Sequence, residues 1–204
     1  VITNADELYS AVRKSGLVGL GGAGFPVSIK LNFSPEKKVD TLVINGAECE
    51  PYLTADYREM MEFPEDIIEG TRFVMETLGL RRSIIGIEGN KPAAIRRLDE
   101  IIRERSLDDK MCVLKLGTSY PHGAEKVLIK ACTNRAVPVG KIPADAGCVV
   151  LNITSVSFIA KYVRTGMPLV SKRITVDGSA IENPKNVIAP LGTMISATAV
   201  FLGG

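Results

Sequence analysis

Hydrophobic and polar positions follow two different periods along most of the chain. Short apolar runs typical of buried strands lie at residues 41–44, 83–88, 111–116 and 148–151. Between them, apolar residues recur every three or four positions, which is the spacing of one helix face, at residues 4–15, 64–79, 92–105, 123–131 and 155–163. This alternation predicts an α/β fold with a mostly parallel sheet and flanking helices. Its ligands should bind beyond the carboxyl ends of the strands.

The pattern changes near residue 170. Residues 173–178 and 184–190 have the alternation and turn residues of a hairpin-like pair of strands. Residues 187–204 carry no charge, but Pro190 and Gly192 interrupt them, so we expect a strand, a turn and a helix start and no membrane span. We therefore divide the chain into an α/β domain, residues 1–169, and the beginning of a second module, residues 170–204. Because the sequence does not begin with methionine, we expect it to be a fragment of a longer chain.

A glycine-rich stretch between the first two helical segments is the strongest functional signal. Four glycines and an alanine fall within residues 19–24, and Phe25-Pro26 ends the run. So many residues without a side chain indicate a backbone that takes positive φ or closely approaches a ligand, most often a phosphate. A helix starting at Pro26 would bring Lys30 one turn further along. The alternative interpretation is a glycine-rich surface turn.

Two well-known phosphate-binding motifs do not fit this stretch. Gly19, Gly21 and Gly24 satisfy G-x-G-x-x-G, but the segment before them is helical, whereas the dinucleotide fingerprint requires a strand there. No Gly-Lys-Ser/Thr follows, so the stretch is not a P-loop either.

Polar residues gather where three of the predicted strands end. They lie at residues 45–51, 88–92 and 117–126. By the carboxyl-end rule all three segments should face one crevice beside the glycine-rich stretch. Each also has a structural interpretation: a common Asn-Gly turn, a helix cap, and an acidic residue near a helix start. Their coincidence favours a binding site.

Composition narrows the class of protein. The chain of 204 residues is 46% hydrophobic and 24% charged, with a formal net charge of +2 and no basic run, which argues against nucleic acid as the main partner. The cysteines at positions 49, 112, 132 and 148 form no C-x-x-C pair. We therefore expect neither a zinc site nor an iron–sulfur cluster, and a reducing, cytosolic setting.

Four ordered motifs together resemble a known family. They are Gly-Leu-Gly-Gly-Ala-Gly-Phe-Pro at 19–26 with Lys30, Asn-Gly-Ala-Glu-Cys-Glu-Pro-Tyr at 45–52, Tyr-Pro-His-Gly-Ala-Glu-Lys at 120–126, and Val-Leu-Asn-Ile-Thr-Ser at 150–155. The set closely resembles RnfC, a component of Rnf-type electron-transport complexes, and, more distantly, the NADH- and FMN-binding subunit of respiratory complex I. The resemblance implies a Rossmann-like sheet followed by the start of a β-grasp module, called SLBB in this family.

The resemblance also implies the cofactors and their contacts. FMN and NADH would occupy the site, and hydride transfer would be cofactor chemistry without a catalytic side chain. The implied positions are Gly19, Gly21, Gly22, Ala23, Gly24 and Phe25 around the cofactors, Lys30 near the phosphate, Asn45 and Glu48 beside the isoalloxazine, Tyr120, Gly123 and Glu125 on the dinucleotide side, and Asn152 at the FMN phosphate or ribityl chain.

The family's partners follow from the same resemblance. The domain would oxidise NADH within an electron-transport complex, on the cytoplasmic side and peripheral to the inner face of the cell membrane. Electrons would pass to 4Fe-4S clusters in a C-terminal part beyond residue 204. Two alternatives remain open here: a flavin-poor adaptor or electron-delivery protein of the same fold, such as one serving proline reductase, and a phosphate-binding enzyme outside the family.

Overall fold

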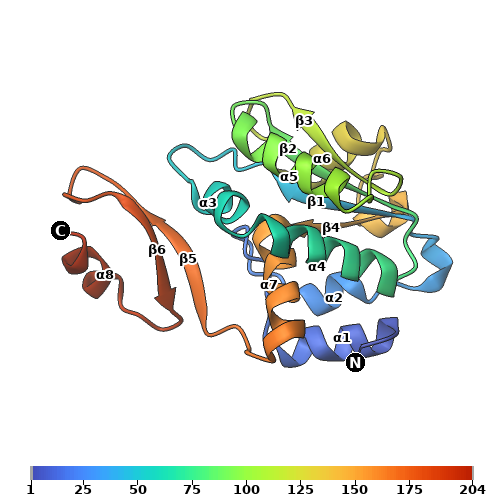
Figure 1. The fold of residues 1–204 in the computed structure, drawn as a ribbon, viewed down its shortest axis with the longest axis horizontal. Coiled ribbons are helices and arrows are strands. Elements are labelled where there is room, and N and C mark those ends of the chain that lie inside the picture. The colour runs from blue at the N-terminus through green and yellow to red at the C-terminus, as the bar shows by residue number, and fades with distance from the viewer. Residues whose placement is uncertain (1, 204) are drawn as a thin grey trace.

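The computed structural model describes residues 2–203, and its centre is a four-stranded sheet in the order β3–β2–β1–β4 (Figure 1). The strands are β1 (Thr41–Gly46), β2 (Arg82–Glu88), β3 (Met111–Leu116) and β4 (Cys148–Asn152). All three pairings are parallel. The prediction of a mostly parallel α/β sheet is therefore confirmed.

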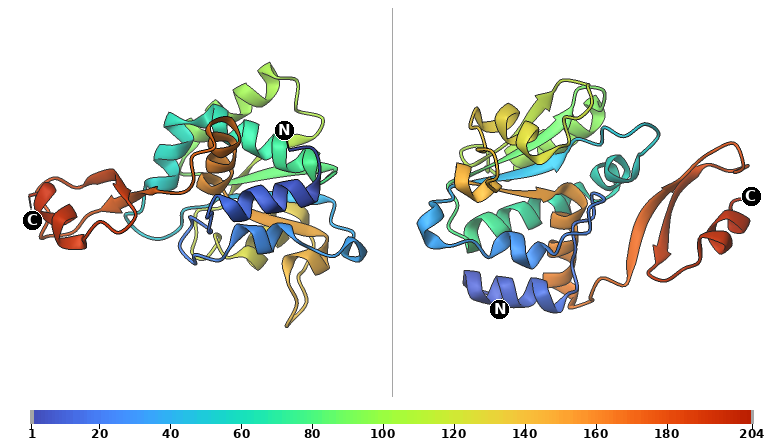
Figure 2. Two further views of the ribbon diagram at one scale, coloured as in Figure 1. Left: turned by 90° about the horizontal axis from the view of Figure 1, so that it is seen from below. Right: turned by 180° about the vertical axis from the view of Figure 1, so that it is seen from behind.

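Helices cover both faces of this sheet (Figure 2). One face packs on α4 (Pro64–Thr77), α5 (Pro92–Glu104) and α7 (Ile153–Thr165), with α1 (Ala5–Lys14) and α2 (Val27–Leu31) completing the same core; the other face packs on α6 (Glu125–Thr133). In β1, Leu42 and Ile44 belong to the larger core, whereas Val43 lies in the core under α6. Burial on both sides explains why β1, β2 and β4 are apolar without alternation, whereas the edge strand β3 has exposed positions at Cys112 and Lys115.

The helix boundaries follow local signals. Asn4 caps α1 by accepting the N–H of Glu7, and prolines occupy the first positions of α4 and α5. The helix predicted from residue 123 begins at Glu125, because Pro121 to Ala124 form a turn stabilised by the hydrogen bond from the Ala124 N–H to the Pro121 carbonyl. The short 3-10 helices η1 (Pro35–Lys37) and η2 (Pro143–Ala146) and the helix α3 (Ala55–Glu62) were not predicted from the pattern.

The connection into β4 determines where a ligand can bind. The chain moves outward from β1 through β2 to β3 and then returns to place β4 on the opposite side of β1. The strand order therefore reverses at β1, and the switch point of the sheet lies at the carboxyl ends of β1 and β4.

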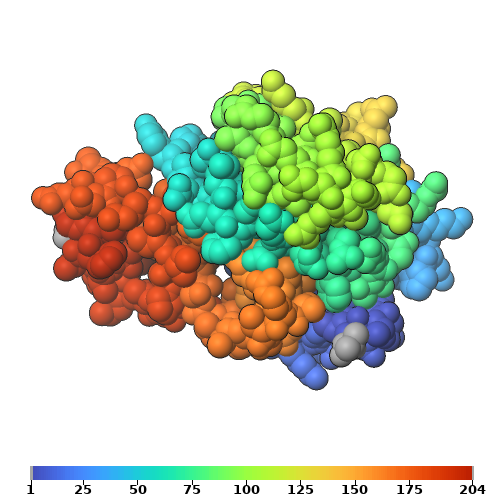
Figure 3. Space-filling view, in the orientation of Figure 1, coloured from blue at the N-terminus to red at the C-terminus, as the bar shows by residue number. Residues whose placement is uncertain are grey.

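The C-terminal part forms a separate antiparallel pair, β5 (Ser171–Val176) and β6 (Lys185–Pro190), followed by α8 (Ile195–Phe201). The predicted hairpin is thus confirmed, while its assignment to a β-grasp module stays a prediction. Figure 3 shows this part as a lobe beside α3. Arg173 of β5 is buried there, forming ion pairs with Glu59 and Glu62. Among residues 2–203, no helix is both long enough and apolar enough to span a bilayer.

Candidate functional site

Two asparagines mark the switch point of the sheet. Asn45 near the end of β1 and Asn152 at the end of β4 are register partners in the parallel pairing of these strands. Both line a hollow that the glycine-rich loop, residues 19–25, also borders. Of the three polar segments predicted to face one crevice, those after β1 and β3 line a crevice together with the glycine-rich loop, as predicted. The segment after β2 lines a neighbouring hollow that does not include the loop.

The glycine-rich loop is closed at its base and anchored to α7. The N–H of Gly19 donates to the carbonyl of Phe25 at 2.8 Å, and Val18 and Pro26 form a β-bridge. The N–H of Leu20 donates to the hydroxyl of Ser155 at 3.1 Å, in the first turn of α7. The loop is thus fixed at both ends, while residues 21–25 are exposed.

The glycines in this loop are required for different reasons. Gly22 and Gly24 have φ of 122° and 63°, a region that other residues rarely adopt. At Gly21 a Cβ would lie 3.0 Å from Nδ2 of Asn152, so the loop backbone lies directly against the asparagine amide. Within residues 2–203, no hydrogen bond of normal geometry uses the N–H of Gly21 or Gly22. Both residues line a crevice that also contains Asn45, Tyr120 and residues 172–175 of β5, which we call the main crevice. Their two N–H donors are therefore available to an anion.

Asn45 fixes the segment that follows β3. Its Nδ2 donates to the carbonyl of Gly123 at 2.9 Å, and its Oδ1 accepts the N–H of Ala47 at 3.1 Å. A Cβ at Gly123 would lie 2.9 Å from the carbonyl oxygen of Ala47, so only glycine permits this approach. Asn45 and Gly123 are therefore at the crevice, as predicted, and each also has a structural role.

Glu48 lies in the crevice wall, but protein donors already occupy its carboxylate. Its oxygens accept the N–H groups of Asp56 and Tyr57, at 2.9 and 3.3 Å, at the start of α3. The ammonium group of Lys91 lies 3.3 Å away, and only 5% of the Glu48 side chain is exposed. The carboxylate thus stabilises the helix N-terminus. Its contact with an isoalloxazine stays a prediction, whereas Glu50 is exposed at the rim.

Asp56 was missed by sequence reasoning because α3 was not recognised. Its carboxylate accepts the Nδ2 of Asn152 at 2.7 Å and the hydroxyl of Thr154 at 2.6 Å. Burial raises the pKa of Asp56 to about 6, and the nearby Glu48 carboxylate adds to the shift. The signal that could have identified it is an aspartate between the polar segment 45–51 and the predicted helix 64–79.

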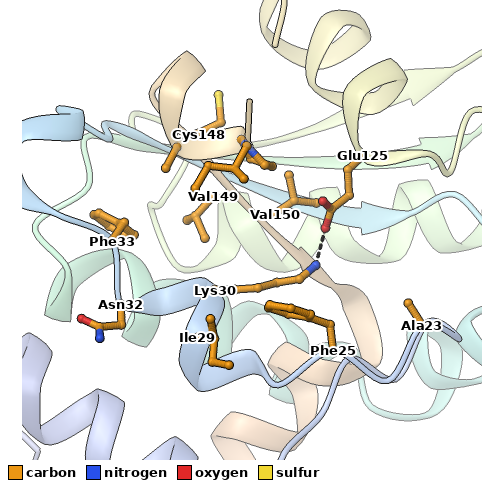
Figure 4. A pocket seen from close by; sticks show the side chains of 13 residues that line it. Ala23, Phe25, Ile29, Lys30, Asn32, Phe33, Glu125, Cys148, Val149 and Val150 are labelled. Carbon is orange, nitrogen blue, oxygen red and sulfur yellow. Dashed lines mark hydrogen bonds and ion pairs between the residues drawn. The ribbon is translucent and has the colours of Figure 1, made fainter. Parts of the chain in front are cut away.

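Lys30 and Glu125 form an ion pair that joins α2 to the first turn of α6. Both were predicted at the site, and the structure brings them together. The pair borders an apolar hollow of about 370 Å³ beside the open edge of β4 (Figure 4). The hollow is lined by Ala23, Phe25, Ile29, Lys30, Asn32, Phe33, Glu125, Ile142, Pro143, Ala144, Cys148, Val149 and Val150.

The main crevice has a volume of about 400 Å³ and extends from the glycine-rich loop to the C-terminal strands. Tyr120 stands at its rim with 74% of its surface exposed. Residues 172–175 of β5 form the opposite wall. The N–H of Thr54 donates to the hydroxyl of Thr175 at 3.1 Å, which connects the rim to the hairpin. The C-terminal segment therefore contributes to the crevice, which the sequence pattern did not predict.

The thiols show no arrangement for metal binding. Within residues 2–203, no group of three or more His, Cys, Asp or Glu side chains is placed to hold a metal ion. Burial raises the pKa of Cys132 to about 12 and raises the pKa values of Cys112 and Cys148. These side chains are thus neutral thiols at physiological pH.

Known proteins are similar in sequence to this chain over nearly its whole length. The "Nuo51 FMN-binding domain" family matches residues 12–161. The chain is 44% identical over 198 residues to the C component of the proton-translocating ferredoxin:NAD(+) oxidoreductase complex of Clostridium ljungdahlii, covering 97% of this chain and 42% of that protein. It is 43% identical over 201 residues to the C component of the Na(+)-translocating ferredoxin:NAD(+) oxidoreductase complex of Acetobacterium woodii, covering 98% and 45%.

A solved structure supports the fold. A chain of an NAD+-reducing [NiFe]-hydrogenase in the H2-reduced state aligns with a TM-score of 0.79 at 21% identity, covering 98% of this chain and 39% of that chain. The chain spans less than half the length of the curated relatives described above. The resemblance to the RnfC component of Rnf-type complexes is confirmed, and the chain belongs to the Nuo51 FMN-binding domain family.

Proposed function

We propose that this chain is the FMN-binding, NADH-oxidising domain of an ion-translocating electron-transport complex. The observation that carries the proposal is the crevice at the β1/β4 switch point, where Asn45 and Asn152 meet a glycine-rich loop. Relatives of this chain are named as subunits of ferredoxin:NAD(+) oxidoreductase complexes.

The residues of the crevice fit a flavin mononucleotide. The N–H groups of Gly21 and Gly22 offer donors to a phosphate, and the absence of a Cβ at Gly21 leaves the Asn152 amide accessible. The crevice lining combines the polar side chains of Asn45 and Asn152 with the ring of Tyr120 and with apolar and basic side chains of β5. A ligand with a flat ring and a charged end matches a lining of this composition.

The apolar hollow in Figure 4 fits the other end of a dinucleotide. Phe25 and Phe33 lie on its walls, and aromatic side chains stack on purine rings. Lys30 lies between this hollow and the asparagines, since it lines both the apolar hollow and the smaller one beside Gly19. We therefore assign the hollow to the adenine end of NADH and Lys30 to its phosphates.

The chain's own residues would position the reactants. Hydride transfer between the nicotinamide and the isoalloxazine is the chemistry that a bound FMN supplies. The closed base of the glycine-rich loop, through the hydrogen bond from Gly19 to Phe25, keeps the loop backbone at a fixed distance from the asparagines. Asn45 fixes the segment carrying Gly123, which forms the facing wall. Such preorganisation favours a face-to-face approach of two flat rings.

The partners belong to the same proposal. Iron–sulfur clusters outside residues 1–204 would take electrons from the flavin, and the domain would attach peripherally to the cytoplasmic face of a membrane complex. The names of the relatives, which are parts of ion-translocating oxidoreductase complexes, support the existence of partner subunits.

A titration tests the proposed function directly. The purified chain should quench FMN fluorescence with a stoichiometry of one per chain, and anaerobic NADH should then bleach the flavin absorbance. Riboflavin, which lacks the phosphate, should bind more weakly because the loop donors lose their partner. A chain that binds neither FMN nor NADH would overturn the proposal in favour of the adaptor alternative.

A further inference from the structure

Asn152 is held by the protein through three of its four hydrogen-bonding positions. Its Oδ1 accepts the N–H groups of Thr154 and Ser155, at 3.0 and 3.2 Å, and thereby caps α7. Its Nδ2 donates to Oδ2 of Asp56 at 2.7 Å. Because the oxygen faces donors and the nitrogen faces a carboxylate, the amide has one favourable orientation.

The remaining N–H of Asn152 lies at the crevice. A primary amide has two N–H donors, and within residues 2–203 Asp56 accepts one of them. The amide lies against Gly21, where a Cβ would be 3.0 Å from Nδ2. Asn152 lines both the main crevice and the smaller hollow beside Gly19. The second N–H is therefore available to a ligand seated on the glycine-rich loop.

Asp56 is well placed to control this amide. Its second oxygen accepts the hydroxyl of Thr154 at 2.6 Å, and its own N–H donates to Glu48 at 2.9 Å. The carboxylate thus bridges α3 to the first turn of α7 through two side chains, Asn152 and Thr154. Hydrogen bonds to a charged acceptor are stronger than neutral ones, so the carboxylate holds the amide more firmly than water would.

We propose that Asp56 is a positioning residue for the flavin site: its carboxylate orients the Asn152 amide so that the free N–H binds the ribityl–phosphate chain of FMN. This inference rests on the proposed function. It adds a residue that does not itself touch the cofactor and that acts only through Asn152. It also explains why a carboxyl group is kept in a partly buried place beside a second carboxylate.

The surroundings make this contact sensitive to pH. Burial raises the pKa of Asp56 to about 6, and protonation replaces a charged acceptor by a neutral one. The charged groups around it are Glu48 after β1 and Lys91 before α5, while Lys172 and Arg173 line the same crevice from β5. Of these, Glu48 raises the pKa of Asp56 and Lys91 lowers it.

A double-mutant cycle on FMN affinity tests the inference. Asp56→Ala and Asn152→Ala should each weaken FMN binding roughly tenfold, since each removes the oriented amide donor. The double variant should bind no more weakly than Asn152→Ala alone. Thermal unfolding of each variant, with near-ultraviolet circular dichroism, verifies that the fold is retained. Equal losses on Asp56→Ala in the two backgrounds would show that Asp56 acts independently of Asn152 and would overturn the inference.

Asp56→Asn is the conservative variant. An asparagine can accept from Asn152 through Oδ1 and donate to the Thr154 hydroxyl through Nδ2, so most of the affinity should return. The ratio of wild-type to Asp56→Asn affinity should fall toward one as the pH is lowered through 6, and using the ratio cancels the titration of the FMN phosphate itself. Tighter binding by Asp56→Asn than by the wild type would mean that the carboxylate only repels the phosphate, which contradicts the inference. Failure of the wild type to bind FMN would instead contradict the proposed function.

Discussion

Lys30 of α2 and Glu125 of α6 form an ion pair across 95 residues of sequence. Each side chain was expected to contact a cofactor, yet in this structure they neutralise each other at the border of the apolar hollow. An incoming phosphate must compete with Glu125 for the ammonium group. Under the proposed function, the pair would set the charge that a dinucleotide meets at this hollow.

The first prediction concerns the choice between NADH and NADPH. The carboxylates of Glu50 and Glu125 border the site, and a 2′-phosphate near one of them costs about 1 kcal/mol per close charge. NADH should be the better reductant of the flavin. Glu125→Gln removes one carboxylate and releases Lys30, so flavin reduction by NADPH should improve about fivefold relative to NADH. Stopped-flow reduction at limiting coenzyme measures the ratio.

Glu100→Gln provides the matched control for this prediction. Glu100 is exposed on α5 and the same charge is removed away from the crevice. The coenzyme ratio should be unchanged in this variant. An equal improvement for NADPH in both variants would attribute the effect to net charge and not to Glu125.

The second prediction concerns the glycine-rich loop. Gly22 has φ of 122° and open space where a Cβ would stand, so Gly22→Val places a branched side chain in the crevice. FMN binding should be lost while the fold is retained, as measured by fluorescence quenching and thermal unfolding. Gly178, in the turn after β5, has φ of 131° and also has open space around it. Gly178→Val therefore introduces comparable backbone strain at a distance, and it should leave FMN affinity unchanged.

The sequence pattern was sufficient for the sheet and for the location of the crevice. Each of the four strands is a short apolar run, and parallel strands place the polar residues that follow them at one edge. Asn45 could therefore be placed at the crevice from the pattern, whereas Asn152, its register partner, was placed there by the resemblance to the RnfC family.

The pattern was not sufficient for α3 and the contacts it makes. Within this helix the buried positions are Glu59 and Met60, so a charged residue occupies a core position where a helical pattern requires an apolar one. Glu59 is accommodated because Lys161 and Ser157 of α7 donate to its carboxylate. Without α3, the burial of Glu48 and the role of Asp56 could not be inferred. Pairings between distant polar side chains leave no periodic signal in the sequence.

The third prediction concerns the attachment of the C-terminal hairpin. Arg173 of β5 is buried against α3, where it forms ion pairs with Glu62 and Glu59 and lies over the ring of Phe63. Arg173→Leu should destabilise this contact by about 2 kcal/mol, because it leaves a partly buried carboxylate with fewer partners. Hydrogen exchange should become faster in β5 and β6. Lys185→Leu, at an exposed end of β6, is the control and should leave that exchange unchanged.

The fourth prediction concerns the pH dependence of stability. Asp56 has a folded-state pKa of about 6 and an ordinary value of 3.8, so between these values the folded state binds more protons than the unfolded state. The fold therefore loses stability as pH rises from about 4 to 6, by roughly 3 kcal/mol from this group, and then no further. Asp56→Asn should remove this loss. The difference in free energy of unfolding between this variant and the wild type, followed from pH 4 to 8 in urea, should increase in favour of the variant up to pH 6 and then level off.

Asp109→Asn is the control for the pH series, because Asp109 is exposed in the turn before β3. Its free energy of unfolding should run parallel to that of the wild type. A flat difference for Asp56→Asn over the same range would show that the carboxyl group is hydrated and titrates at its ordinary pKa.

The last prediction concerns iron. Cys112 of β3, Cys132 of α6 and Cys148 of β4 lie on three different elements, and burial raises the pKa of each thiol, whereas cluster ligands are thiolates. Residues 1–204 should therefore bind no iron–sulfur cluster, and a flavin reduced by NADH on this domain should pass electrons only to small acceptors such as ferricyanide or oxygen. Iron and acid-labile sulfide should be absent after anaerobic purification and reconstitution. Replacing Cys49 by Ser should change neither assay, because no second cysteine belongs to its segment. Stoichiometric iron and sulfide in the wild type would contradict both the assignment of these cysteines as thiols and the proposal that the electron-accepting clusters lie elsewhere.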